Sequence, residues 1–152
     1  MTSMTSMTLL AAVLVAQAVA SGVMAGIIWF VQLVHYPLFA AVTGPGEAAY
    51  ARANQARTSL LVLPPMLIEA AAAGWIAVWP PAGIGRGPAL LGVVLVGLVW
   101  LSTLAVQMPL HARLAREGHT ADVVTTLVRS NWPRTVLWTA RAVLAAWMLA
   151  VA

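Results

Sequence analysis

Long apolar runs alternate with short polar, proline- and glycine-rich connections along almost the whole chain. The four runs cover residues 8–34, 57–79, 89–108 and 132–152, and each matches the roughly 20 residues that a helix needs to cross a bilayer core. Backbone groups in lipid are satisfied only within helices or closed barrels, and these runs lack the alternation of barrel strands. The pattern predicts an all-α integral membrane four-helix bundle, one transmembrane domain over residues 1–152.

The connection between the third and fourth runs carries a helical signal of its own. Thr120 is a suitable N-cap and Asp122 would lie in the first turn of the helix that follows. We therefore expect a short interfacial helix over residues 121–129, separate from a fourth span that begins near Asn131. Within the second run, Pro64-Pro65 should kink the helix.

Composition supports the membrane interpretation and excludes several kinds of site. Only 8% of the residues are charged, against roughly 25% in a typical soluble domain. The absence of Cys excludes disulfides, zinc thiolate sites and iron–sulfur clusters. All eight basic residues are Arg, and they lie beside the apolar runs rather than on a soluble face. We therefore expect the lipid bilayer as a partner and no nucleic acid.

The distribution of Arg predicts the orientation in the membrane. The connections after runs one and three, with the adjoining helix ends, hold seven of the eight arginines, and the connection after run two holds only Arg86. Cytoplasmic connections are enriched in basic residues. The chain should therefore lie in the cell membrane as a multi-pass protein, with the Arg-rich connections in the cytoplasm and both termini outside.

Two short motifs recur in the two halves of the chain. Gln32 and His35 close the first run, and Gln107 and His111 close the third. An Asn-x-x-Arg-Thr string then starts 19 residues after His35, at Asn54, and 20 residues after His111, at Asn131. The recurrence predicts two helical hairpins related as parallel internal repeats about an axis along the membrane normal.

Two ionisable residues within the apolar runs have no counterpart in the other half: Glu69 in the second run and Arg141 in the fourth. Ionisable groups in a membrane are costly and face the bundle interior with a partner. The expected depths of these two differ by about five residues, or roughly 7–8 Å of helix rise. We therefore expect them to pair.

The polar residues support three interpretations that the sequence alone leaves open. In the first, a pocket at the cytoplasmic end binds a hydrophobic, aromatic or polyketide-like small molecule and, as a cofactor-independent enzyme, oxidises it. A His would remove a proton and Arg and Asn would stabilise the oxyanion. Its candidate catalytic residues are His35, His111, Arg134, Arg141, Asn131, Gln107 and Glu69. Its candidate lining residues are Gln32, Asn54, Arg57, Trp100 and Trp138.

The other two interpretations need no such substrate. In one, His35 and His111 ligate a haem or a metal in a redox protein. In the other, the chain is a non-enzymatic membrane subunit or a small transporter, in which Arg141 and Glu69 only hold helices together. Four helices are few for a transporter, so that version implies a homo-oligomer.

Three motifs resemble those of a known family. HYPLF follows the first run, MPLHARL ends the third and NWPRTVLWTAR opens the fourth, and in this order they are similar to the DUF1772, or anthrone-oxygenase-like, family of small four-helix membrane proteins. The resemblance implies a four-helix membrane fold and an oxygenase activity on polyketide-type compounds. The family pattern has Asn after the third-helix Pro, where this chain has His111, and a His before the fourth-helix Arg, where this chain has Trp138 or Asn131.

Overall fold

Four long helical units make up the bundle. The computed structural model describes the backbone of residues 2–152 and the side chains from Met7 onward, and within this part all regular elements are helical. The elements are α1 (Thr2–Phe30), a π-helical turn (Val31–His35), α2 (Tyr36–Leu38), a 3-10 turn (Phe39–Ala41), α3 (Glu47–Val78), α4 (Arg86–Ser102), a second π-helical turn (Thr103–Gln107), α5 (Met108–Glu117) and α6 (Ala121–Val151).

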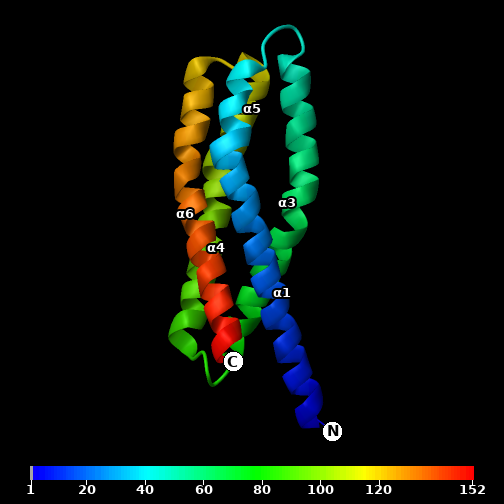
Figure 1. The fold of residues 1–152 in the computed structure, drawn as a ribbon, viewed down its shortest axis with the longest axis vertical. Helices are drawn as coiled ribbons and strands as arrows, with labels where there is room; N and C mark the ends of the chain where they lie inside the picture. The colour runs from blue at the N-terminus through cyan, green and yellow to red at the C-terminus, as the bar shows by residue number, and fades with distance from the viewer. Residues whose placement is uncertain (1) are drawn as a thin grey trace.

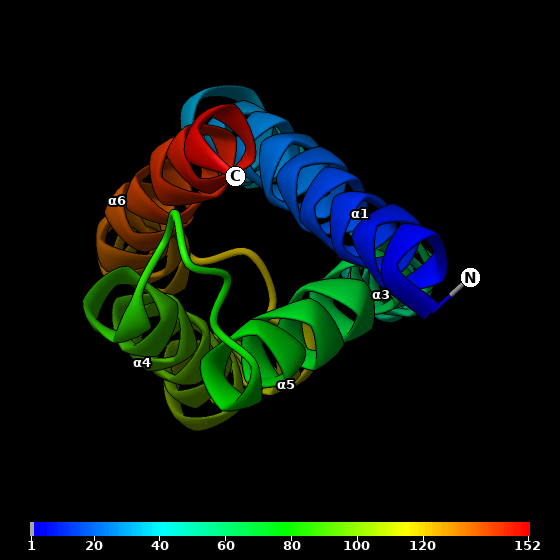
Figure 2. The ribbon, with the colours of Figure 1, turned by 90° about the horizontal axis from the view of Figure 1, so that it is seen from below.

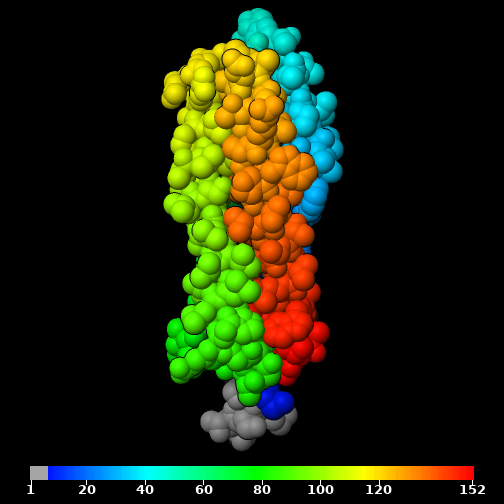
Figure 3. Space-filling view, turned by 90° about the vertical axis from the view of Figure 1, so that its left-hand side faces the viewer, coloured from blue at the N-terminus to red at the C-terminus, as the bar shows by residue number. Residues whose placement is uncertain are grey.

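The helices run up and down around a shared interior. Seen along the axis, α1, α3, the α4–α5 unit and α6 form the four corners of the bundle (Figure 2). Figure 3 shows α6 and the α4–α5 unit side by side along most of their length. Both termini lie at one end with the connection between α3 and α4, and the other two connections lie at the opposite end (Figure 1). We call that opposite end, formed by residues 39–47 and 117–121, the distal end.

All four units are long and apolar enough to cross a membrane. The stretches that meet this criterion are Met7–Ala41, Glu47–Val78, Arg86–Glu117 and Ala121–Val151. This confirms the predicted all-helical chain with four apolar helices. Each unit extends past the predicted apolar run at the distal end, where the helix continues beyond the hydrocarbon-length segment.

The predicted separate interfacial helix over residues 121–129 is wrong. These residues form the first turns of α6, which continues without a break through Pro133. A proline inside a helix leaves the carbonyl four residues earlier without its partner, and here that carbonyl belongs to Arg129, an exposed residue. The lost bond therefore does not lie in the bundle interior, and the helix tolerates Pro133.

Prolines also mark three other places in the bundle. Pro64 and Pro65 lie inside α3, and Figure 1 shows this helix changing direction near its middle, as predicted. Each π-helical turn ends two residues before a proline, Pro37 in the first half and Pro109 in the second. A π turn inserts an extra residue, rotates the faces of the helix on either side and often occurs at a functional site.

Two apolar clusters lie towards the two ends of the interior. The larger one, near the distal end, includes Phe39, Leu114, Leu127 and Trp138. The smaller one, near the termini, includes Leu14, Ile76, Ile84, Ala89 and Met148. Polar side chains occupy the interior beside and between these clusters.

Candidate functional site

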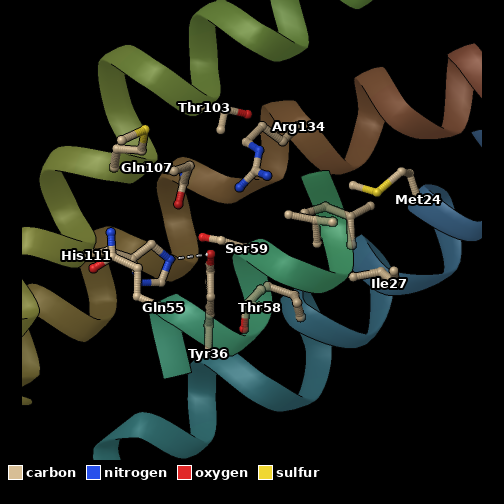
Figure 4. A pocket seen from close by; sticks show the side chains of 14 residues that line it. Met24, Ile27, Tyr36, Gln55, Thr58, Ser59, Thr103, Gln107, His111 and Arg134 are labelled. Carbon is tan, nitrogen blue, oxygen red and sulfur yellow. Dashed lines mark hydrogen bonds between the residues drawn. The ribbon is translucent and has the colours of Figure 1, made fainter. Parts of the chain in front are cut away.

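A small cavity lies inside the bundle on the side of the distal end, where all four helical units contribute to its walls (Figure 4). Its volume is about 90 Å³. Its polar lining residues are Tyr36, Gln55, Thr58, Ser59, Thr103, Gln107, His111 and Arg134, and its apolar ones are Met24, Ile27, Ile28, Val31, Val62 and Met108. The walls therefore combine polar and apolar side chains from all four helical units.

A tyrosine–histidine pair forms one wall of the cavity. The Tyr36 hydroxyl lies 2.8 Å from Nε2 of His111, and Figure 4 shows this contact at the cavity wall. Tyr36 follows the first π turn and is only 5% exposed. The sequence interpretation named His111 and overlooked Tyr36. Its position next to Pro37, at the end of a span, was the one available signal.

Arg134 lies beside this pair, as a polar neighbour of Tyr36. Its guanidinium reaches into the cavity from α6 (Figure 4), and the residue is 6% exposed. Nη1 donates a hydrogen bond to Oδ1 of Asn131 at 3.1 Å, whereas the buried Nε has no partner. The ion pairs of the described residues join Arg113 to Glu117 and Arg141 to Glu69, so no carboxylate compensates the charge of Arg134.

Gln107 adds a second polar atom without a partner. It lies in the second π turn and is 2% exposed. Its Nε2 donates to the Ser130 hydroxyl at 3.2 Å, but the buried Oε1 accepts no hydrogen bond. Buried polar groups are nearly always satisfied in native proteins. The unpaired donor on Arg134 and the unpaired acceptor on Gln107 therefore belong to two residues that line the same cavity.

A hydrogen-bond network behind the cavity fixes Arg134 in place. Gln32, in the first π turn, donates to the Val128 carbonyl at 3.1 Å and accepts from Asn131 Nδ2 at 2.9 Å. The Thr135 hydroxyl contacts the same Gln32 oxygen at 3.4 Å. Asn131 in turn accepts from Arg134. The first π turn thus positions the guanidinium through Asn131, although neither Gln32 nor Asn131 lines the cavity.

The remaining predicted residues near the distal end lie outside the cavity walls. His35 is half-buried and its Nε2 lies 2.9 Å from Asn54 Oδ1, so this pair stays within the first hairpin. Arg57 is exposed. Trp100 and Trp138 pack in or against the larger apolar cluster, where their rings fill space between helices.

Glu69 and Arg141 form the predicted ion pair, which is confirmed. Both side chains are fully buried, with Ser21 as a further polar neighbour of Glu69. Gly92 of α4 leaves space for the guanidinium, since a Cβ there would lie 3.5 Å from the guanidinium carbon. Arg141 follows Arg134 by seven residues, or about 10 Å of helix rise. The pair is therefore a separate polar layer, deeper than the cavity.

Neither histidine of the haem interpretation presents a free Nε2, since His35 bonds Asn54 and His111 bonds Tyr36. In the part of the chain that the structure describes, no three His, Cys, Asp or Glu side chains lie together as a metal site would require.

No protein-family model, curated protein or solved structure matches this chain. The resemblance to the anthrone-oxygenase-like family accordingly stays a prediction from short motifs, and the site has to be interpreted from its own geometry.

Proposed function

We propose that this four-span membrane protein binds the oxygen-bearing end of an apolar small molecule, such as a phenol or an enolisable ketone, in the cavity at Arg134. The observation that carries the proposal is the buried guanidinium of Arg134, a cavity-lining residue that has no carboxylate partner among the described residues and whose Nε makes no hydrogen bond. An unpaired buried charge is costly. An oxygen atom that carries or develops negative charge would offset that cost.

The two free polar atoms favour a hydroxyl group as the bound end. The Nε of Arg134 needs an acceptor and the Oε1 of Gln107 needs a donor. A hydroxyl can accept from the first and donate to the second, whereas a carboxylate is an acceptor only. A phenol, or the enol form of a ketone, therefore fits this wall better than a carboxylic acid in its ionised form.

The size of the cavity limits how much of the molecule enters. Its volume of about 90 Å³ is well below the 300–1,000 Å³ of sites that enclose a drug-sized ligand. Ser59 of α3 and Met108 of α5 line the cavity and are also exposed at the surface of the bundle. The polar end would thus lie inside, and the apolar remainder would extend towards the bilayer.

The Tyr36–His111 pair gives the site an acid–base function. Nε2 of His111 lies at the cavity wall within hydrogen-bond distance of the Tyr36 hydroxyl. The Tyr36 hydroxyl could relay to this nitrogen a proton from a bound hydroxyl, or from a carbon next to a carbonyl. Arg134 would stabilise the resulting oxyanion. Asn131 acts on this step only by positioning Arg134.

Oxidation of the bound molecule is the further step that the family resemblance implies. An activated CH2 group would become a carbonyl, with dioxygen as the oxidant. One oxygen atom would enter the product and the other would leave as water with the two hydrogens. In this proposal the chain supplies proton removal by His111 and charge stabilisation by Arg134.

The binding proposal can be tested with 1-naphthol and with naphthalene, which lacks the hydroxyl. Both are titrated by equilibrium dialysis into the full-length protein in lipid nanodiscs, with protein-free nanodiscs as the baseline. We expect 1-naphthol to bind more tightly. Arg134→Gln should weaken its binding about tenfold or more, because hydrogen bonds to charged groups contribute about 1.5–3 kcal/mol.

Arg57→Gln is the matched control, because it makes the same chemical change at an exposed position of the other half. It should leave binding unchanged. If folded Arg134→Gln bound 1-naphthol as the parent protein does, or if naphthalene bound equally well, the proposal would be wrong. Loss of thermal stability in Arg134→Gln without a change in binding would favour the structural-subunit interpretation.

We also propose that the distal end faces the cytoplasm. The helix segments next to the distal end carry Arg52, Arg57, Arg113, Arg116 and Arg129, whereas Arg86 lies at the other end, with both termini (Figure 1). Cytoplasmic ends of membrane helices are enriched in Arg. The chain has no native Cys, so single-Cys variants report on one position each. In intact cells, a membrane-impermeant maleimide should label Ala82→Cys. It should label Thr43→Cys only after the cells are lysed. The reverse pattern would overturn the orientation.

A further inference from the structure

An apolar groove runs along the surface of the bundle between α1 and α3. Its volume is about 540 Å³. On α1 it is lined by short side chains such as Ala12, Ala16 and Val19, and on α3 by Pro64 and Pro65, where the helix changes direction. The small residues of α1 and the bend in α3 together leave the groove open.

The groove and the cavity are lined by neighbouring residues of α1 and α3. On α1, Val23 lines the groove and Ile27, one turn further, lines the cavity. On α3, Leu61 lines the groove and Thr58, about one turn away towards the distal end, lines the cavity. Residues three or four apart lie on one face of a helix. The two hollows therefore follow each other along the same α1–α3 seam.

We infer that the ligand is an amphiphile with a phenol- or enol-type head in the cavity and one long apolar tail in the α1–α3 groove. This inference rests on the proposed function, because the cavity supplies the site for the head. It adds a class of substrate: the tail makes the ligand a membrane lipid rather than a compact aromatic compound.

The dimensions of the groove favour a single tail. From Ala12 to Val23 the groove spans eleven residues of α1, or about 16 Å, which is close to half of a ~30 Å hydrocarbon core. A volume of about 540 Å³ over that length gives a mean cross-section of about 33 Å². A helix at least 10 Å across occupies ~80 Å². The groove is thus wide enough for a hydrocarbon chain and narrower than a whole helix.

The head and the tail should contribute differently to binding. A tail in the groove exchanges contacts with lipid for contacts with apolar side chains, and lipid tails are as apolar as those side chains. Its transfer from the bilayer therefore contributes little affinity. The head gains hydrogen bonds to Arg134 and Gln107 that lipid cannot offer. The location of the tail is for this reason a better test than the affinity.

The probe is 4-dodecylphenol with a diazirine at the end of its tail, added to the full-length protein in nanodiscs. After irradiation, labelled peptides are identified by mass spectrometry. We expect labelling of the two groove segments, residues 12–23 and 61–68. Excess 4-dodecylphenol should suppress it, and excess dodecane, which has no head, should not. Equal suppression by dodecane would identify ordinary annular lipid contact and overturn the inference.

Two variants with the same substitution complete the test. Ala16→Phe fills the groove and should reduce labelling of both segments about tenfold. Ala140→Phe places the same ring on an exposed position of α6 and should change nothing. Labelling that persists in Ala16→Phe would overturn the inference. So would a shift from dimer to monomer in Ala16→Phe, seen by mass photometry, since it would show a second copy on this face.

The failure of this inference and that of the proposed function are distinguishable. If 4-ethylphenol, which has the head and almost no tail, bound in an Arg134-dependent way while the groove segments stayed unlabelled, only the tail assignment would be wrong. If 4-ethylphenol did not bind, the proposed function would fail with it.

Discussion

Removing one partner of the buried Glu69–Arg141 ion pair should destabilise the bundle far more than removing both. Both side chains are fully buried and each is the other's ion-pair partner. Arg141→Met keeps most of the side-chain volume and deletes the charge. It leaves the Glu69 carboxylate in the interior, where Ser21 is its further polar neighbour among the residues whose side chains are described.

The expected magnitude follows from this isolation. Breaking a buried ion pair by removal of one partner costs about 3–5 kcal/mol, because the remaining charge is uncompensated. Replacing both partners with apolar residues of similar volume is often neutral or stabilising by about 1–4 kcal/mol. We therefore expect Arg141→Met and Glu69→Leu each to cost several kcal/mol. The double variant should be close to the parent protein, so that the two effects couple strongly.

The assay is the free energy of unfolding of the purified protein in mixed bicelles, titrated with a denaturing detergent and followed by tryptophan fluorescence. The four proteins form a double-mutant cycle. A coupling energy of about 3 kcal/mol or more would support the argument. Additivity within about 0.5 kcal/mol would refute it, because it would mean that the two groups do not compensate each other in the folded bundle.

Three further predictions concern the surroundings of Arg141, the network behind the cavity and the contact between the two distal connections. Gly92→Ala should be tolerated in a thermal melt and Gly92→Leu should cost about 1–3 kcal/mol, because a Cβ fits beside the Arg141 guanidinium at 3.5 Å and a larger side chain does not. Gln32→Leu should lower the melting temperature, because it leaves Asn131 Nδ2 without its hydrogen-bond acceptor, at a cost of about 1–3 kcal/mol. A melting temperature equal to that of the parent protein would contradict this. Glu47→Gln should speed hydrogen exchange of the His119 backbone amide, because this amide donates a hydrogen bond to the Glu47 carboxylate at 2.8 Å. Unchanged exchange would show that this contact does not hold the two distal connections together.

The sequence predicted the features that depend on the lipid solvent. Apolar runs of bilayer length specify helices because lipid offers no hydrogen bonds to the backbone. The four apolar runs therefore predicted the four long helices. The pairing of Glu69 with Arg141 was predictable for the same reason, since two ionisable groups at similar depth have few other partners. These predictions needed only residue type and position along the chain.

The details of the cavity were less predictable because they depend on the π turns. Regular 3.6-residue spacing places Gln32 and His35 on one face, but a π turn over Val31–His35 adds a residue and changes which side chains face inward. Gln32 is buried in the structure, Tyr36 reaches the cavity and His35 stays outside it. Nothing in the hydrophobic pattern marks the start of a π turn.

The two halves of the chain contribute unequally to the site, which bears on the predicted duplication. Arg57 and Arg134 occupy the same place in the two Asn-x-x-Arg-Thr strings, yet Arg57 is exposed and Arg134 is buried at the cavity. When the halves are aligned on the prolines that follow the π turns, His35 corresponds to Gln107 rather than to His111.

That alignment changes which residues could act as a pair. His35 bonds Asn54 within its own hairpin, whereas His111 bonds Tyr36 of the other hairpin. If the halves arose by duplication, the cavity was built where they diverged, from a tyrosine of the first half and a histidine and an arginine of the second. The proposed chemistry then depends on the difference between the hairpins at Arg134, and the Glu69–Arg141 layer below holds together the helices that carry it.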